Sequence, residues 1–203
     1  MPGSTCGSTS GSTWTETLRR ERSRLLDTME SLTEAEFEAG STLCAGWTPR
    51  DVLAHVIGTD QLFNYAKPSG LTIDRANAAM VREGRLLSRA ELIRRGRAVA
   101  MNPGVTARMF AWLLAGDCAM HHQDVLRGLG KPHDLPAEAG RAIYLEGTIW
   151  SWVLGAKLLR YRVIPTTEGG RPRGRGRPVR GSTEALSLWL AGRESLRSEL
   201  EFD

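Results

Sequence analysis

The sequence predicts a mostly α-helical protein built as a helix bundle, and three observations support this fold class. Apolar residues recur at helical spacing in four long segments, modest connections join these segments, and almost no stretch alternates apolar and polar residues as a strand does. The 203 residues suit one domain, and the apolar content of 41% is ordinary for a globular protein. We therefore expect one bundle with a small appendage.

The N-terminal sequence MPGSTCGSTSGST is rich in Gly, Ser and Thr and offers little to bury. We expect residues 1–13 to form a disordered tail. The tail lacks the charged and apolar regions of a signal peptide, and no apolar run approaches the roughly 20 residues that cross a membrane. The three cysteines fit no disulfide framework. These features predict a cytoplasmic protein with reduced thiols.

The first helix is expected from about Thr15 to Leu32, where leucines and a methionine recur at helical spacing. Residues 32–38 are expected to form a short capped turn. The next helix begins after Thr48, a preferred N-cap residue, with Pro49 at the first helical position. This start is the sharpest local signal in the chain.

Asp51 stands at the third position of that second helix, so we assign it to the helix terminus rather than to catalysis. Pro68 and Gly70 are expected to end the helix. Residues 67–88 then form a long connection, and long loops in compact domains often act as lids. We expect this connection to be a candidate lid over a functional site.

Further helices are expected over residues 88–101, over residues 106–129 and from residue 136 onward. The first of these has Ser88 as N-cap and Glu91 at the third position, which together predict a capping box. The sequence Asn-Pro-Gly breaks it, and a glycine ends the second. With these elements, the bundle is expected to occupy residues 14–160.

Residues 161–203 are expected to form a small C-terminal extension with a short strand at Tyr161 to Pro165 and one short last helix. Between them, RPRGRGRPVR at residues 171–180 holds five arginines and no acid. Removing these five charges from the net charge of +4 leaves −1 for the rest of the chain. Because no aromatic residue interleaves with the arginines, we expect a solvated loop, and a nucleic-acid partner is not favoured.

Asp117, His121 and Asp124 share one face of the fourth helix with apolar residues, and His55 lies on the apolar stripe of the second. Asp117 and His121 are one turn apart, so their side chains can converge. Buried ionisable groups are normally paired or bound to a metal, and facing helices supply such ligands in bundle cores. We expect His55, Asp117 and His121 to bind a divalent metal with open coordination positions. The alternative is a buried His–Asp network that only fixes the helix register.

Two segments, LCAGWTPRDVLAHVIGTD at 43–60 and DCAMHHQDVLRGLG at 117–130, resemble the paired motifs of the mycothiol-dependent maleylpyruvate isomerase-like proteins. These proteins belong to the DinB-like metal-binding superfamily. The sequence VRGSTEALSLWLAGR at 179–193 is similar to the family's C-terminal segment. The resemblance covers most of the chain from about Thr15 onward, and it implies a DinB-like four-helix bundle with a small C-terminal extension.

The resemblance also implies that the metal is most often zinc and that its ligands match His55, Asp117 and His121. The family has Glu where this chain has Asp117, whose carboxylate lies one methylene closer to the backbone. We therefore expect an altered coordination geometry, a different metal preference or a weakened site. Asp124 matches a further motif position, and we expect it to orient His121 or a neighbouring helix.

A low-molecular-weight thiol such as mycothiol is the cosubstrate that the resemblance implies. The thiolate is the nucleophile, and zinc deprotonates a coordinating thiol. Addition of the sulfur to an electrophilic small molecule, followed by rotation and elimination, would isomerise a cis double bond; addition alone would make the protein an S-transferase. Cys44 and Cys118 are not needed as nucleophiles, and we expect both to be packing residues.

Two other functions stay open. A metal-bound water would make the protein a hydrolase or lyase, for which Asp124 and Asp60 are weak candidates for the general base. A non-catalytic ligand-binding or resistance protein on the same fold is the other possibility, and the departure at Asp117 favours it. Arg82, Arg127 and the arginines of 171–180 are candidates for binding an anionic substrate group. We expect a monomer or homodimer that does not bind a membrane.

Overall fold

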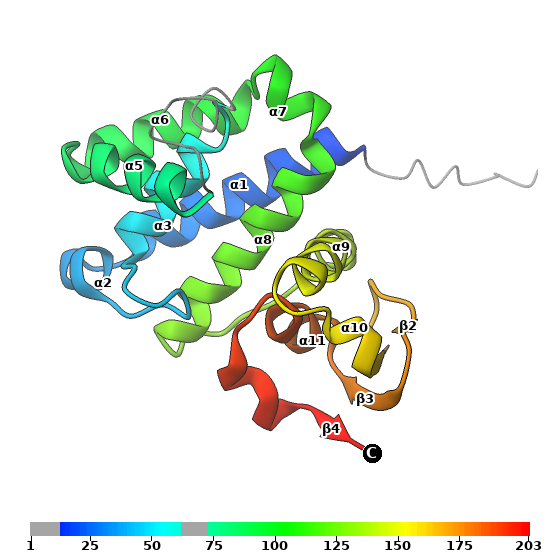
Figure 1. Cartoon of the computed structure of the whole chain (residues 1–203). Helices are drawn as coiled ribbons and strands as arrows, with labels where there is room; N and C mark the ends of the chain where they lie inside the picture. Colours follow the sequence, from blue (N-terminus) through cyan, green and yellow to red (C-terminus); the bar gives the residue numbers. More distant parts are fainter. Residues whose placement is uncertain (1–12, 62–72) are drawn as a thin grey trace, which may run out of the picture.

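The computed structural model describes residues 13–61 and 73–203, and it confirms the mostly α-helical fold class (Figure 1). Long helices make up most of the molecule, and a small sheet lies with the C-terminal helix at one end. The helices are α1 (Trp14–Ser31), α2 (Glu34–Ala39), α3 (Pro49–Gly58), α5 (Ile73–Arg85), α6 (Arg89–Met101), α7 (Val105–Met109), α8 (Ala111–Gly128), α9 (Ala137–Val153), α10 (Lys157–Arg160) and α11 (Thr183–Leu190). A 3-10 helix, η2 (Glu194–Glu199), precedes the last strand.

Helices α1, α3, α6 and α8 form the bundle, and each packs against two of the others. Helix α1 packs against α6 and α8, and α3 packs against the same two helices from the other side. Fully buried apolar side chains at helical spacing, among them Leu18 and Leu25 of α1 and Val52 of α3, fill the space between them. This packing brings α3 and α8, which carry the predicted metal ligands, into direct contact.

The start of α3 is confirmed in detail. The Thr48 side chain accepts a hydrogen bond from the Asp51 amide, and the Asp51 carboxylate accepts one from the Thr48 amide, so the two form a capping box. Asp51 also accepts two hydrogen bonds from Arg85 of α5. Its assignment to the helix terminus rather than to catalysis agrees with these contacts.

The expected end of this helix and the expected loop need correction, whereas the lid role stays a prediction. Helix α3 ends at Gly58, ahead of Pro68 and Gly70, which lie outside the described residues. Most of the expected loop 67–88 is helix α5, which packs along α3. The helix forms because Ala76, Met80 and Val81 present one apolar face to the bundle, so propensity and packing override the length argument for a loop.

The fourth expected helix is divided. Helices α7 and α8 meet at Phe110, whose φ of −107° and ψ of 23° interrupt the helical path. Met109 and Phe110, on either side of this break, are 67% and 38% exposed. The buried stripe instead begins inside α8, where Ala111, Leu114 and Ala115 enter the core.

The C-terminal extension contains a four-stranded sheet in the order β2-β1-β3-β4. The strands are β1 (Tyr161–Pro165), which the sequence predicted with these bounds, β2 (Arg173–Gly174), β3 (Arg177–Gly181) and β4 (Glu201–Phe202). β1 pairs with β3 in parallel and with β2 in antiparallel orientation. The expectation of a plain loop over 171–180 was therefore wrong. Val179 of β3 is fully buried in the second core cluster, and this burial favours a strand.

Helix α9 lies between the bundle and the C-terminal extension. It packs against α8 on one side and α11 on the other, and its Ile143 and Tyr144 belong to a second core cluster with Trp189 and Val163. The proposed boundary between residues 160 and 161 stays a prediction. Residues 1–12 of the expected tail lie outside the described part of the chain. Among the described helices, none combines the length and the apolar character that crossing a bilayer requires.

Candidate metal centre

His55 of α3 and the pair Asp117 and His121 of α8 come together inside the bundle. The Asp117 Oδ1 atom lies 3.4 Å from His55 Nε2 and 3.5 Å from His121 Nε2. One potential ligand atom from each residue lies within 4.8 Å of the other two. Asp117 and His121 converge because they are one helical turn apart, and His55 meets them because α3 packs on α8.

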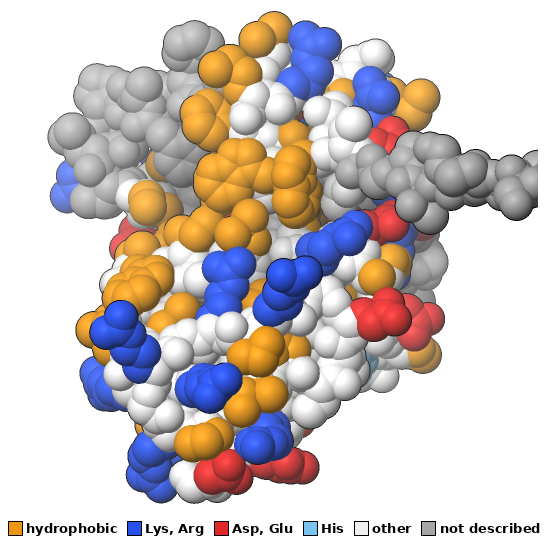
Figure 2. Space-filling model, turned by 90° about the vertical axis from the view of Figure 1, so that its right-hand side faces the viewer, with side chains coloured by type: hydrophobic (Ala, Val, Ile, Leu, Met, Phe, Trp, Pro, Cys, Tyr) orange, Lys and Arg blue, Asp and Glu red, His pale blue; other side chains and the backbone are white. Residues whose placement is uncertain are grey.

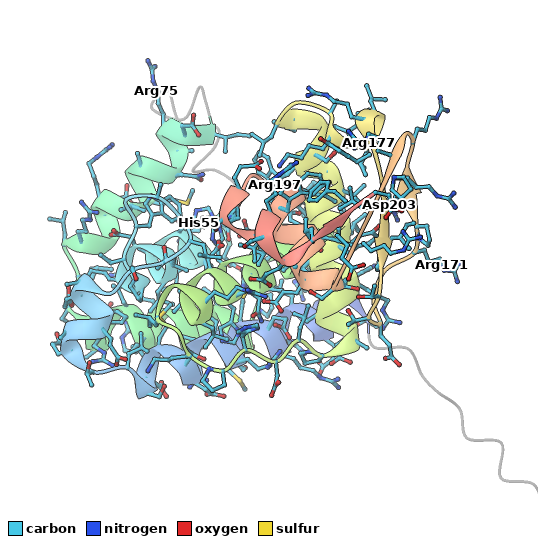
Figure 3. The ribbon with its side chains drawn as sticks, turned by 90° about the horizontal axis from the view of Figure 1, so that it is seen from below. His55, Arg75, Arg171, Arg177, Arg197 and Asp203 are labelled. Atoms are coloured by element: carbon cyan, nitrogen blue, oxygen red, sulfur yellow. The ribbon has the colours of Figure 1, made fainter. Side chains whose placement is uncertain are left out.

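The site is nearly enclosed. His55 and His121 are 3% and 8% exposed, whereas the Asp117 side chain is 19% exposed. The Trp47 ring stacks on His121 with ring centroids 5.8 Å apart, and it lies 5.1 Å from the His55 ring. Figure 3 shows His55 among the helices of the bundle. Of the three candidate ligands, Asp117 is therefore the most exposed to solvent.

The polar atoms of this cluster fit a divalent cation. The Asp117 Oδ2 atom is buried without a hydrogen-bond partner, and the contacts of Oδ1 at 3.4 and 3.5 Å are longer than good hydrogen bonds. Buried carboxylate oxygens are normally satisfied. Two imidazole nitrogens and one carboxylate are a donor set that zinc accepts, with a coordination position left for another ligand.

Behind His121, Asp124 and Arg193 form a buried ion pair that reaches the imidazole ring. Asp124 is fully buried, and its Oδ2 lies 3.1 Å from His121 Nδ1. Arg193, which follows α11, donates hydrogen bonds from Nη2 and Nε to the two Asp124 oxygens at 2.5 and 3.0 Å. A carboxylate on Nδ1 holds the proton at that nitrogen and leaves Nε2 free to bind a metal.

The pKa values of the cluster follow from burial and from the neighbouring charges. Burial raises the pKa of Asp117, but His55, His121 and Arg193 outweigh it and bring the pKa to about 2. Burial lowers the pKa of His55, which stays below its usual value despite Asp117. Burial also acts to lower the pKa of His121, but Cys44, Asp117 and Asp124 raise it well above the usual value. The Asp117 carboxylate is therefore ionised at neutral pH, as a metal ligand must be.

Cys44 needs a correction, because it contacts the site rather than packing in the core. Its Sγ donates to Asp124 Oδ2 at 3.0 Å and lies 3.4 Å from both His121 Nδ1 and Arg193 Nη2. Cys44, His121 and Asp124 form a second group whose potential ligand atoms lie within 4.8 Å. By contrast, Cys118 is a core residue as expected, and burial raises its pKa strongly.

Glu146 of α9 is a buried acid that reasoning from the sequence missed. It is 3% exposed, its Oε1 accepts a hydrogen bond from Trp150 Nε1 at 2.6 Å, and its Oε2 is buried without a partner. Burial, and next the charge of Asp117, raise the pKa of Glu146 to about 8. Its place on the apolar face of α9 was the signal that could have revealed it.

The other candidate residues lie in separate interactions. Asp60 forms an ion pair with Arg22 at 2.7 Å, and Arg127 pairs with Glu184 and Glu199. Arg82 is exposed on α5. None of these three candidates belongs to the clusters of potential metal ligands found among the described residues.

Comparison with known proteins agrees with this fold. Residues 18–100 match the model of the mycothiol maleylpyruvate isomerase N-terminal domain. The crystal structure of the mycothiol-dependent maleylpyruvate isomerase is similar to the chain with a TM-score of 0.60 and 17% sequence identity, over 94% of this chain and 91% of that one. A crystal structure of a mutant of that enzyme gives a TM-score of 0.60 and 16% identity over the same shares.

No curated protein matches the sequence. At 16–17% identity the two crystal structures show a shared fold, and the domain match over residues 18–100 covers α3 and His55 but stops before α8. The expected resemblance is confirmed. Residues 18–100 are thus similar to the N-terminal domain of the mycothiol maleylpyruvate isomerase family, and the rest of the chain shares the fold of such an enzyme.

Proposed function

We propose that the protein is a metal-dependent enzyme that uses a mycothiol-like thiol to attack an electrophilic small molecule, as an isomerase or S-transferase. The metal is zinc, held by His55 Nε2, Asp117 and His121 Nε2, and the protein acts in the cytoplasm as a monomer or homodimer. The observation that carries the proposal is the convergence of two Nε2 atoms and a carboxylate with an unpartnered oxygen in a nearly enclosed site.

The residues around the ligands support this chemistry. Zinc, when bound, lowers the pKa of a coordinating thiol, so that the thiolate is available as the nucleophile. Asp124 and Arg193 keep the His121 ring oriented with its proton on Nδ1. The Trp47 ring packs against both imidazole rings. Asp117 is the ligand most open to a substrate, because its side chain is partly exposed.

The two alternatives have less support in these contacts. A hydrolase would need a free general base near a metal-bound water, but Asp124 is committed to Arg193 and Asp60 to Arg22. A non-catalytic binding protein would need a site that the Asp117 carboxylate fails to complete. Asp117 Oδ1 instead lies about equally far from the two Nε2 atoms, so the shorter side chain still reaches between them.

The first experiment is a competitive zinc titration of the metal-depleted protein. We expect one zinc per chain, with the affinity reduced at least about 100-fold in each of His55→Ala, Asp117→Ala and His121→Ala, since each removes one of three ligands. His133→Ala is the matched control, because this histidine pairs with Glu184 outside the cluster. Unchanged affinity in the three variants, or equal loss in the control, would refute the metal site.

A cobalt-substituted protein separates the two possible ligand groups. If His55, Asp117 and His121 bind the metal, the spectrum lacks a thiolate-to-cobalt charge-transfer band, and Cys44→Ser leaves it unchanged. Appearance of that band upon adding a low-molecular-weight thiol would support an open position that takes the cosubstrate. A charge-transfer band before thiol addition, lost in Cys44→Ser, would instead assign the metal to Cys44, His121 and Asp124.

Thiol dependence of turnover tests the reaction class. We expect conversion of cis-configured unsaturated dicarbonyl compounds, or their conjugation, only when a low-molecular-weight thiol is present. Turnover that needs metal but no thiol would favour the hydrolase or lyase. Absence of both stoichiometric zinc and turnover of any electrophile would favour the binding protein.

A further inference from the structure

A cavity of about 380 Å³ lies at the junction of α1, α9 and the segment that joins β1 to β2, outside the metal centre. Trp14 at the start of α1 forms one wall, Tyr144 and Leu145 of α9 another, and residues 169–171 with Arg173 the third. Arg141 of α9 completes the lining. Figure 3 shows Arg171 at the outer edge of the molecule, well removed from His55.

The wall between β1 and β2 is held firmly on α9. Gly169 has a φ of +99°, and a Cβ atom there would lie 2.8 Å from the backbone carbon of Gly140, so only glycine allows this close approach. The hydroxyl of Tyr144 donates to the carbonyl oxygen of Arg171 at 2.8 Å. The wall formed by residues 169–171 is therefore anchored to α9.

The chemistry of the lining is positive and aromatic. Arg141, Arg171 and Arg173 make no ion pair within 4.0 Å with any carboxylate of the described residues. The nearby Glu138 is already paired with Arg20 at 2.9 Å. The Arg173 guanidinium lies 5.7 Å from the centre of the Tyr144 ring. Figure 2 shows separate Lys and Arg side chains spread over the lower part of this face, with acidic side chains toward its margins.

These features together favour a specific class of ligand. Guanidinium groups bind carboxylates and phosphates through paired hydrogen bonds, and the indole of Trp14, which is 41% exposed, offers a flat apolar surface. The volume is within the range of sites for small molecules. We propose that this cavity binds a small planar anion, an aromatic or heteroaromatic ring that carries a carboxylate or a phosphate.

Binding to the metal-free His55→Ala variant tests the proposal, because that background removes a competing anion site at the metal centre. The probes are AMP, benzoate and inorganic phosphate, measured by calorimetry in about 150 mM salt to suppress unspecific binding. We expect saturable one-to-one binding of AMP, of benzoate or of both. Binding of AMP alone would assign the phosphate form of the ligand, and binding of benzoate alone would assign the carboxylate form.

Substitutions of the lining arginines then test whether the ligand binds in this cavity. Arg141→Ala combined with Arg173→Ala should weaken binding by at least about tenfold, since charge-assisted hydrogen bonds are lost. Arg162→Ala is the matched control, because this arginine is exposed on β1 and does not line the cavity. Three outcomes would overturn the proposal: no saturable binding of either ring compound, equal loss in the control, or inorganic phosphate binding as tightly as AMP.

Discussion

Asp124 shows how much one side chain controls at the metal centre. It is fully buried, it accepts two hydrogen bonds from Arg193, and it contacts His121 Nδ1 and the Cys44 thiol. A carboxylate can only accept at His121 Nδ1, and this selects the tautomer whose Nε2 faces Asp117 and His55. The Asp124 oxygen, which does not itself bind the metal, thus decides whether His121 Nε2 is free to bind it.

Asp124→Asn is expected to weaken zinc binding by about 10- to 100-fold. The amide can donate to His121 Nδ1, which would place the ring proton on Nε2 and block the ligand atom. Competitive zinc titration measures the effect, with far-UV circular dichroism to confirm that the helices remain. Asp134→Asn, at an exposed position, is the control. An affinity within a factor of two of wild type would show that Asp124 does not select the tautomer.

The raised pKa of Glu146 predicts that the stability of the metal-free protein depends on pH. Its pKa is about 8 in the folded chain, against the ordinary glutamate value of 4.5, so the unfolded chain loses this proton first as pH rises. The folded state therefore binds more protons between these values, and this group lowers the free energy of unfolding by about 1.4 kcal/mol per pH unit. The loss ends once the pH exceeds about 8.

Urea denaturation of wild type and Glu146→Gln from pH 5 to pH 8 isolates this contribution from that of the other groups. The variant should gain stability relative to wild type as pH rises. Glu138→Gln, whose carboxylate lies in an exposed ion pair with Arg20, should track the wild type. If the difference between Glu146→Gln and wild type does not change with pH, Glu146 ionises in the folded protein as it does in water.

At the scale of elements, the contact between α3 and α5 positions His55. A Cβ atom at Gly84 of α5 would lie 2.2 Å from the Cβ of Ala54, the neighbour of His55 on α3. Gly58 of α3 meets Met80 of α5 in the same interface. Because the Ala54 Cβ is fixed to the helix backbone, a side chain at position 84 could fit only if α5 or α3, which carries His55, moved.

Gly84→Ala is therefore expected to lower the free energy of unfolding by about 1–3 kcal/mol through overpacking. In a helix free of such contacts the same change would raise the free energy of unfolding by about 1 kcal/mol. The sign of the change therefore shows whether position 84 is closely packed. Urea denaturation measures the stability, and zinc titration should show a parallel loss of affinity. Leu86→Ala, at a side chain that is 86% exposed, serves as control. A stabilised Gly84→Ala variant would contradict the close packing of α3 and α5.

For the whole molecule, Arg193 connects the C-terminal extension to the bundle. It follows α11, yet its guanidinium binds Asp124 in α8 and contacts the Cys44 thiol in the loop before α3. The side chain is 17% exposed, whereas its partner Asp124 is fully buried. Removing the arginine would leave a buried carboxylate with no cationic partner other than His121.

Arg193→Ala is expected to destabilise the protein by about 3–5 kcal/mol, the cost of leaving one partner of a buried ion pair. Thermal and urea unfolding measure the loss, and hydrogen exchange should increase in both α8 and the C-terminal extension. Arg175→Ala, an exposed arginine between β2 and β3, should change stability by less than about 0.5 kcal/mol. A loss below about 1 kcal/mol for Arg193→Ala would mean that Asp124 is satisfied by other groups.

Local patterns of the sequence alone determined a large part of this protein. The helical class, the capping box of Thr48 and Asp51, the strand from Tyr161 to Pro165 and the one-turn spacing of Asp117 and His121 all depend on neighbours within a few residues. Such features follow from backbone geometry and short-range hydrogen bonds, so they can be deduced without knowing the fold.

Only the tertiary structure decided which distant residues complete the site. Cys44 and Arg193 are separated by 149 positions and Asp124 and Arg193 by 69, and nothing in their local sequence indicates that they meet. The role of Glu146, the stacking of Trp47 on His121 and the conversion of arginine-rich residues 177–181 into a strand likewise depend on packing. Burial and long-range contact fix their environment and hence their charge, because desolvation and neighbouring charges arise only when the chain has folded.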